Sequence, residues 1–177
     1  SYDQIYDEHI YMFSLSSISK IFKLYDFELA DALPQVTHGG SMRYIIKRKG
    51  CDKQTSQLLS LIDKEKNKNI DTLESCISFK KNCEISKAKI TKKVQELKAK
   101  GKKVWGYAAT SKSTTILNYC QIDHNFIDYI CDTTPEKVGK FSPGMHIPIV
   151  NMEYFYKNQP DAAYLFAWNH KKEIFKK

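Results

Sequence analysis

The stretch from residue 101 to residue 131 constrains the fold more than any other part of the sequence. An apolar run at 104–108, V-W-G-Y-A, indicates a buried strand, and a polar turn at 110–114 leads directly into an apolar helix around Ile116. Further elements expected in this half are a strand at 126–131, a helix around 152–157 and a strand at 162–167. Strands that alternate with helices in this way are typical of parallel βαβ units. We therefore predict an α/β fold with a Rossmann-like parallel sheet in the second half.

The first half has a different pattern. Ser14 is a suitable N-cap for a helix that ends near Asp26, and a turn rich in glycine at 37–41 separates two strands that could pair, at 27–33 and 42–47. A helical pattern then runs from 56 to 100 with a break near 67–69, and Gly101 stands where a C-cap glycine is expected. We expect an N-terminal segment with a helix and a strand pair (1–55), a helical connection with a short and a long helix (56–100) and the Rossmann-like part (101–177).

Composition excludes several classes of protein. With 177 residues, 42% hydrophobic and 27% charged, the chain suits one packed globular domain and is too short for two complete ones. Residues 1–13 do not resemble an export signal, and no apolar run is long enough to span a bilayer, so we expect a soluble, cytoplasmic protein. The five cysteines are widely spaced without a C-x-x-C pair, which indicates reduced thiols and no metal site. Ser1 is not an initiator methionine, and we expect the chain to be cut from a longer protein.

The net charge of +8 is concentrated in one segment. Between Lys80 and Lys103 there are ten lysines against two glutamates, and the apolar residues between them recur at helical spacing. A solvent-exposed face of an amphipathic helix accounts for this pattern. Phosphate binding to nucleic acid and a basic interaction surface are alternatives, but the segment lacks interleaved aromatic residues and arginine, which disfavours nucleic acid.

Three short segments have the residue types of a functional site. The turn 111–115 places hydroxyl groups and Lys112 at a helix N-terminus, which suits an anion. It is neither a Walker A nor a G-x-G-x-x-G sequence, and simple helix capping is the alternative. Residues 6–9, Y-D-E-H, place a histidine beside carboxylates, which are the components of a general base. The alternative is a surface histidine that stands next to acidic residues without a catalytic role. The long loop 132–148 is either a binding loop or a plain crossover connection.

These segments, taken in order, resemble the C-terminal domain of S-adenosylmethionine-dependent sugar C-methyltransferases. The similarity runs from Tyr6 to Ile174 and rests on five separated motifs. They are Y-D-E-H with F-S-L (6–15), T-H-G-G-S-M-R (37–43), the G-K-K-V to N-Y-C stretch (101–120), the D-x-x-P-x-K-x-G to P-G-x-H-I-P stretch (132–148), and P-D with A-W-N (160–169).

The resemblance implies a nucleotide-linked 4-ketosugar as substrate and transfer of a methyl group to the carbon beside the ketone. It implies that His9 is the base, that Glu8 orients it and that Tyr6 binds the keto or enolate oxygen. The turn around Lys112 and the loop 135–146 would hold the nucleotide diphosphate, and Trp168 and Asn169 would lie near the base or the sugar. The full set of implied substrate-binding residues is His38, Ser41, Arg43, Tyr107, Ser111, Lys112, Ser113, Lys137, His146, Trp168 and Asn169.

The chain departs from the family pattern at four positions around the turn. Ser113 and Thr114 replace glycine and asparagine, and Ala108 and Gln121 replace glycines. The zinc-binding segment and the methyltransferase domain of the family have no counterpart in this sequence. We therefore expect S-adenosylmethionine to be bound by a domain absent from this chain, which alone would be inactive. The rival hypothesis is a non-catalytic nucleotide-binding Rossmann-like domain.

Overall fold

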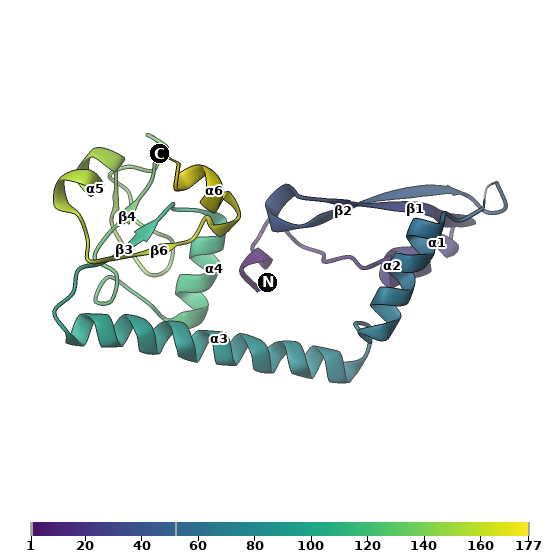
Figure 1. Ribbon diagram of the computed structural model, residues 1–177, viewed down its shortest axis with the longest axis horizontal. Coiled ribbons are helices and arrows are strands. Elements are labelled where there is room, and N and C mark those ends of the chain that lie inside the picture. The colour runs from purple at the N-terminus through teal and green to yellow at the C-terminus, as the bar shows by residue number, and fades with distance from the viewer. Residues whose placement is uncertain (1, 52, 177) are drawn as a thin grey trace. The chain divides into compact units, whose positions relative to one another are not determined.

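The structure is a computed structural model that describes residues 2–51 and 53–176, and its contacts group the chain into two compact units (Figure 1). The sheet unit consists of Ser1–Ile10 with Asn82–Lys177, and the hairpin unit consists of Tyr11–Lys81. The N-terminal residues therefore belong with the second half of the chain. Each unit is described by itself.

The hairpin unit contains the helix and strand pair expected for the first half. Helix α1 (Leu15–Lys23) precedes β1 (Phe27–Gln35), the short turn η2 (Thr37–Gly39), β2 (Ser41–Arg48), α2 (Ser56–Asn67) and the beginning of α3 (Leu73–Ala99). The two strands are antiparallel, with Phe27 opposite Arg48 and Gln35 opposite Ser41. The expected strand pair, the break between two helices and the long helix are thus confirmed.

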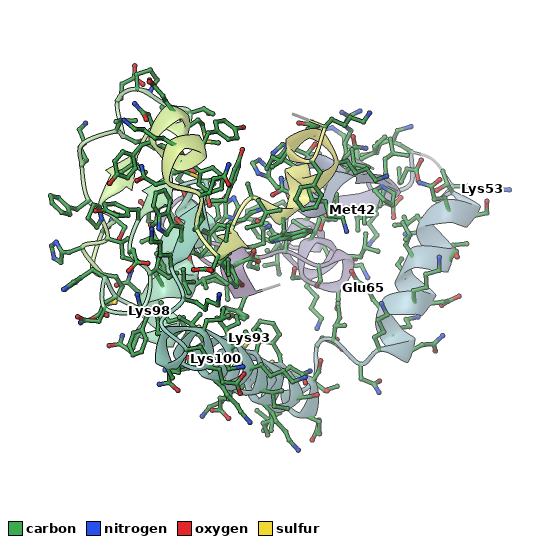
Figure 2. The ribbon with its side chains drawn as sticks, turned by 60° about the vertical axis from the view of Figure 1, so that its left-hand side comes forward. Met42, Lys53, Glu65, Lys93, Lys98 and Lys100 are labelled. Atoms are coloured by element: carbon green, nitrogen blue, oxygen red, sulfur yellow. The ribbon has the colours of Figure 1, made fainter. Side chains whose placement is uncertain are left out.

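Helix α1 begins where the sequence predicts, because its first amides find partners. Ser14 and Ser17 form a reciprocal capping box. The Glu65 carboxylate of α2 accepts the backbone N–H groups of Leu15 and Ser16 at 2.9 and 3.1 Å (Figure 2). Both helices pack on the hairpin through a small apolar core of Leu15, Ile18, Leu29, Ala32 and Leu58.

The sheet unit contains four parallel strands in the order β5-β4-β3-β6. The strands are β3 (Val104–Tyr107), β4 (Ile130–Cys131), β5 (Ile149–Val150) and β6 (Ala162–Leu165). The helical elements are η1 (Tyr2–Gln4), α4 (Ser111–Cys120), α5 (Met152–Asn158), η3 (Trp168–His170) and α6 (Lys171–Ile174). The α/β class and the parallel sheet are confirmed.

Two strands of this sheet differ from the expectation. The strand expected at 126–131 is only Ile130–Cys131, because Phe126 and Ile127 donate their N–H groups back to the Asp123 carbonyl in a turn. Strand β5 was not expected at all. Its two residues carry too little pattern to be recognised without their pairing partner.

Side chains along β3 point alternately to the two faces of the sheet, and helices pack on both faces. The Trp105 and Tyr107 rings lie 5.7 and 5.6 Å from the ring of Phe155 on α5. Val104 and Gly106 face the other way. A Cβ atom added to Gly106 would lie 2.6 Å from the Phe166 ring, so only glycine fits there. The core on that side joins α3 and α4 to the sheet. Its buried residues are Val94, Val104, Ile116, Leu117, Cys120, Ile122, Ile127, Ile130, Ile147 and Phe166.

The lysine-rich segment forms the second part of α3 and the turn after it. Gly101 ends the helix with a φ of 70°, and Lys102 donates its N–H to the Leu97 carbonyl, as expected of a glycine C-cap. Several lysine side chains of this segment are exposed, among them Lys93 on α3 and Lys100 in the turn after it (Figure 2). Of the described helices, none combines the length and the apolar character needed to cross a membrane.

Candidate functional site

A cavity of about 640 Å³ lies beyond the carboxyl end of β3, where α/β sheets usually bind ligands. It brings together the N-terminal segment, the first turn of α4 and the loop after β4. Its lining residues are Tyr6, Asp7, Ala109, Thr110, Ser111, Ser113, Thr114, Thr115, Asn118, Lys137, Lys140, Phe141, Ser142, Pro143 and Ile149. Tyr6, Ser111, Ser113 and Lys137 were all singled out from the sequence. We call this space the carboxyl-end cavity.

The first turn of α4 is a capped helix N-terminus that opens into this cavity. The Thr110 hydroxyl oxygen accepts the Ser113 N–H at 3.1 Å. The Ser113 hydroxyl donates to the Thr110 carbonyl at 2.6 Å, and the residue is buried. Ser113, which replaces a family glycine, thus directs its hydroxyl back into the turn. The helix N-terminus keeps the partial positive charge that favours an anion.

Asp132 fixes the two segments that flank this turn. Its carboxylate accepts the N–H groups of Ala109 at 2.7 Å and Thr134 at 2.8 Å and lies 3.5 Å from the Lys137 ammonium. Burial opposes its ionisation, but the Thr134 bonds, the Lys137 charge and the Ala109 bond outweigh burial and hold the Asp132 pKa below its usual value. Lys137 also donates to the Ala109 carbonyl at 2.8 Å. This network joins the carboxyl ends of β3 and β4.

Asn118 attaches the far side of the cavity to α4. Its amide donates to the Pro143 carbonyl at 3.0 Å and to the Thr114 carbonyl at 2.8 Å. Gly144 has a φ of 79°, and its missing side chain makes room for Asn118. The asparagine therefore holds the loop against the helix.

The N-terminal segment is attached to the same unit by several side-chain contacts. The Tyr2 and Tyr119 rings lie 5.2 Å apart, and the Thr115 hydroxyl donates to the Ile5 carbonyl at 3.1 Å. The Trp168 indole N–H donates to Asp3 at 2.6 Å. These contacts place Tyr6 and Asp7 at the cavity, whereas Glu8 and His9 are not among its described lining residues.

Within that motif, Tyr6 and His9 lie against each other with ring centroids 4.1 Å apart. The Nδ1 atom of His9 lies 2.8 Å from the Gln4 carbonyl oxygen, which can only accept. His9 in its neutral form therefore carries its proton on Nδ1 and its basic lone pair on Nε2. Burial and the charges of Glu8, Asp3 and Asp7 raise the Tyr6 pKa, so the phenol stays protonated at neutral pH. Glu8 is exposed.

Lys112, Trp168 and Asn169 form a second group near the cavity. Lys112 is 6% exposed, its ammonium donates to the Asn169 amide oxygen at 2.9 Å, and it lies 4.9 Å from the centre of the Trp168 ring. Because Trp168 also binds Asp3, this group connects the turn after β6 to the N-terminal segment. The three residues expected to bind substrate are brought together, although none of them is among the described residues that line the carboxyl-end cavity.

The remaining residues implied by the resemblance lie elsewhere. Tyr107 ends β3 and packs on α5, and burial raises its pKa. His146 lines a different cavity at the amino end of the sheet. His38, Ser41 and Arg43 belong to the hairpin unit, where His38 adopts a φ of 56° in the turn and Ser41 begins β2.

Sequence reasoning missed Lys140, Asn118 and Thr110 as residues of the site. Lys140 follows Gly139 in the loop that was expected to bind, so its charge was a usable signal. Thr110 was visible as a helix N-cap. Asn118 stands in the N-Y-C part of the motif at 101–120, but its contact with Pro143 could not be foreseen because it depends on how the loop folds back.

The comparisons with known proteins agree with this arrangement. The C-methyltransferase C-terminal domain family matches residues 36–177, and the chain belongs to this family. Among curated proteins it is similar to the C-methyltransferase NovU of Streptomyces niveus, with 31% identity over 174 residues. That alignment covers 98% of this chain and 41% of the relative, so the chain spans less than half the length of NovU.

Among the residues that the structure describes, no group of three or more histidine, cysteine or acidic side chains could hold a metal ion. The five cysteines are free thiols: Cys51 and Cys76 are exposed, whereas Cys83, Cys120 and Cys131 are buried. Burial raises the Cys131 pKa to about 12, so this thiol beside the site is neutral and unreactive at physiological pH.

Proposed function

We propose that this chain is the substrate-binding portion of a C-methyltransferase that acts on a nucleotide-linked 4-ketosugar, and that it carries the base of the reaction. The observation that supports this proposal best is the carboxyl-end cavity, which has an anion-binding helix turn on one side and Tyr6 on another. A nucleotide diphosphate and a ketosugar need these two kinds of group at one place.

The charges of the lining favour a negatively charged ligand. Lys137 and Lys140 line the cavity together with one described carboxylate, Asp7, which leaves an excess of one positive charge. The first turn of α4 adds backbone N–H groups and the hydroxyl of Thr114. Backbone donors and lysines together are a common way to bind phosphate.

The chemistry assigned to the N-terminal motif is proton removal. His9 Nε2 takes the proton from the carbon beside the ketone, and the electron pair of that C–H bond moves to the ketone oxygen to form an enolate. The Tyr6 hydroxyl, kept protonated by its raised pKa, donates a hydrogen bond to that oxygen. The Gln4 carbonyl holds the His9 tautomer, and we assign Glu8, the neighbour of His9 in the chain, to orienting and supporting the imidazolium that results.

The methyl donor, S-adenosylmethionine, does not fit the residues of this cavity. The donor carries a positively charged sulfonium, whereas the described lining has more positive than negative side chains. The turn after β3, A-A-T-S, also lacks the glycines of a dinucleotide-type loop. We assign the donor to another part of the longer protein.

Isothermal titration of the 177-residue chain with dTDP, GDP and CDP tests substrate binding, with S-adenosylmethionine as a control. We expect one nucleotide to bind and the cofactor not to bind. Lys140→Ala should weaken that binding about tenfold, the effect of one charged hydrogen bond, whereas Lys100→Ala, in the turn after α3, is the matched control for charge. Equal effects of the two variants would contradict the assigned site.

The longer enzyme tests the role of His9. His9→Ala should lower kcat about a hundred- to ten-thousand-fold, as loss of a general base does, with little change in nucleotide affinity. Tyr6→Phe should also lower kcat with little change in affinity. His170→Ala changes an exposed histidine outside this machinery and serves as the control. Full activity of the His9 variant would favour the rival hypothesis of a non-catalytic nucleotide-binding domain.

A further inference from the structure

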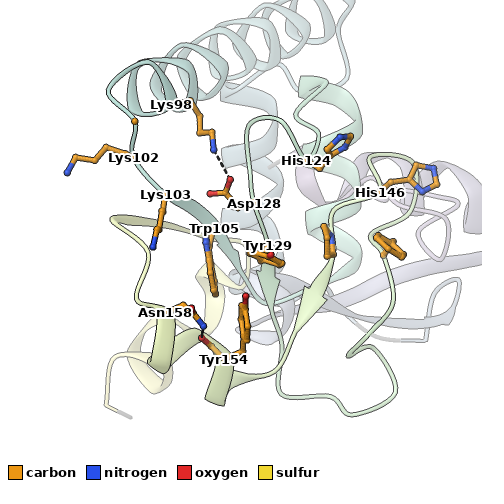
Figure 3. A pocket seen from close by; sticks show the side chains of 13 residues that line it. Lys98, Lys102, Lys103, Trp105, His124, Asp128, Tyr129, His146, Tyr154 and Asn158 are labelled. Carbon is orange, nitrogen blue, oxygen red and sulfur yellow. Dashed lines mark hydrogen bonds and ion pairs between the residues drawn. The ribbon is translucent and has the colours of Figure 1, made fainter.

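A second cavity, of about 750 Å³, lies at the amino ends of the same strands (Figure 3). The residues that line it are Lys98, Gly101, Lys102, Lys103, Trp105, His124, Asp128, Tyr129, Phe141, His146, Pro148, Tyr154 and Asn158. Of the described lining residues, only Phe141 also lines the carboxyl-end cavity. The volume is in the range of pockets that bind small molecules. We call this space the amino-end cavity.

The floor of the amino-end cavity is a stack of aromatic rings. The Trp105 and Tyr154 rings are nearly parallel, 14° apart, with centroids separated by 5.7 Å. Tyr129 packs against both rings at 5.0 and 5.4 Å. Trp105 is almost fully buried, but Tyr154 is 40% exposed. Tyr154 thus presents a ring face that Trp105 holds from behind, a suitable platform for a flat heterocycle.

The charged groups of this cavity differ in whether they already have partners. Lys98 binds Asp128 at 2.7 Å, and Lys102 binds Asp161 at 2.9 Å and points away from the cavity in Figure 3. The Lys103 ammonium makes no hydrogen bond or ion pair within the described part of the chain. Lys103 and Trp105 are two residues apart and lie on one face, and Figure 3 shows the lysine beside the indole. This ammonium is therefore available to an anion.

Three further donors surround the same space. The Trp105 indole N–H has no acceptor among the residues that the structure describes, although its side chain is only 2% exposed. His124 and His146 are both exposed and stand at the side of the cavity across from Lys103 (Figure 3). A ring platform with cationic and N–H donors around it suits a flat ring that carries a phosphate.

We infer that the amino-end cavity binds a mononucleotide, with its base on the Tyr154 ring and its phosphate held by Lys103. This site is distinct from the one proposed for the nucleotide-linked sugar and does not depend on that proposal. Lys98 and Lys102 are each paired with an aspartate, so the Lys103 ammonium is the positive charge that favours the phosphate over an uncharged aromatic compound.

Nuclear magnetic resonance of the 177-residue chain tests this inference, because its two tryptophans give two indole N–H signals. Trp168→Phe identifies the signal of Trp105. Adenosine 5′-monophosphate is the probe, with adenosine and inorganic phosphate as controls. We expect the nucleotide to shift the Trp105 signal in a saturable way and each control to bind at least tenfold more weakly.

Three variants decide whether the contacts are the ones inferred. Lys103→Ala should weaken binding about tenfold, as loss of one charged hydrogen bond does, and Tyr154→Ala should weaken it at least as much by loss of stacking. Lys100→Ala removes the same charge from an exposed position outside the cavity lining and should leave the affinity unchanged. Equal loss in the Lys100 and Lys103 variants would overturn the inference.

The same spectra separate this site from the carboxyl-end cavity. A nucleotide that shifts only the backbone amides of residues 110–115 binds at the carboxyl-end cavity, which would overturn this inference and support the proposed function. An unmoved Trp105 signal at millimolar nucleotide would also overturn it, whatever the titrations with nucleoside diphosphates show.

Discussion

Ala108→Gly should make the sheet unit more stable, although glycine usually destabilises a folded chain. Ala108 has a φ of 73°, in the left-handed region, at the point where β3 turns into the site. An alanine held there costs about 1–2 kcal/mol. Glycine removes this cost but adds about 0.4–1 kcal/mol of entropy to the unfolded chain. The net expectation is a gain of about 0.8 kcal/mol, the middle of the range that these two values allow.

Ala109→Gly is the matched control, because the neighbouring residue has no positive φ. Ala109 packs against the core of the sheet unit, and glycine would relieve no left-handed backbone strain at this position. The substitution should destabilise the unit by about 0.5–1 kcal/mol. The two variants make the same chemical change one residue apart, and the expected effects have opposite signs.

Tryptophan fluorescence during urea unfolding measures both effects, since Trp105 and Trp168 both lie in the sheet unit. The urea concentration at the unfolding midpoint should rise for Ala108→Gly and fall for Ala109→Gly. The slope of the unfolding free energy against urea concentration should stay unchanged. In thermal unfolding the Ala108 variant should gain about 1–4 °C. A midpoint that falls in both variants would show that the left-handed alanine is not strained, and the reasoning would be refuted.

Three further substitutions test other parts of the structure. Gly106→Ala should lower stability by about 1–3 kcal/mol in the same urea assay, because its Cβ would overlap the Phe166 ring; a neutral result would contradict this packing. Asp132→Asn should cost about 1.5–3 kcal/mol at pH 7. Because the pKa of Asp132 is lowered in the folded state, the difference in unfolding free energy between the wild type and the variant should have its full size above about pH 4. It should shrink as the pH falls further, and a difference that stays constant with pH would rule out the ionised network. Glu65→Ala should speed amide hydrogen exchange in the first turn of α1 by about fivefold, because the loss of this cap lowers the stability of the turn by about 1 kcal/mol. Unchanged exchange rates in that turn would exclude a capping role of Glu65.

Local chemistry explains why most of the fold could be predicted from the sequence. Ser14 caps α1 with its own side chain, and Gly101 ends α3 by its backbone conformation. Both signals act within a few residues. The strand expected at 126–131 was too long because the turn at Asp123 depends on backbone bonds that hydrophobicity does not reveal.

The position of the N-terminal segment could not be predicted, because long-range contacts determine it. The bond between Asp3 and Trp168 joins residues that are 165 positions apart. A sequence pattern shows that residues 6–9 contain a tyrosine and a histidine. Only the fold shows that the Gln4 carbonyl selects the His9 tautomer and that Tyr6 lines the same cavity as the α4 turn.

The lysine in the α4 turn shows how a correct motif can leave a side chain's direction open. A basic residue in an anion-binding turn is expected to point at the ligand, but Lys112 is buried and binds Asn169 beside the Trp168 ring. Its direction depends on the turn after β6, some 55 residues further along the chain. Because Lys137 and Lys140 line the cavity instead, the loop after β4 supplies the lysines that can contact a bound phosphate directly. The charge of Lys112 would then attract the ligand by long-range electrostatics and not by a direct hydrogen bond. We therefore expect Lys112→Met to reduce nucleotide affinity less than Lys140→Ala does in the titrations described above.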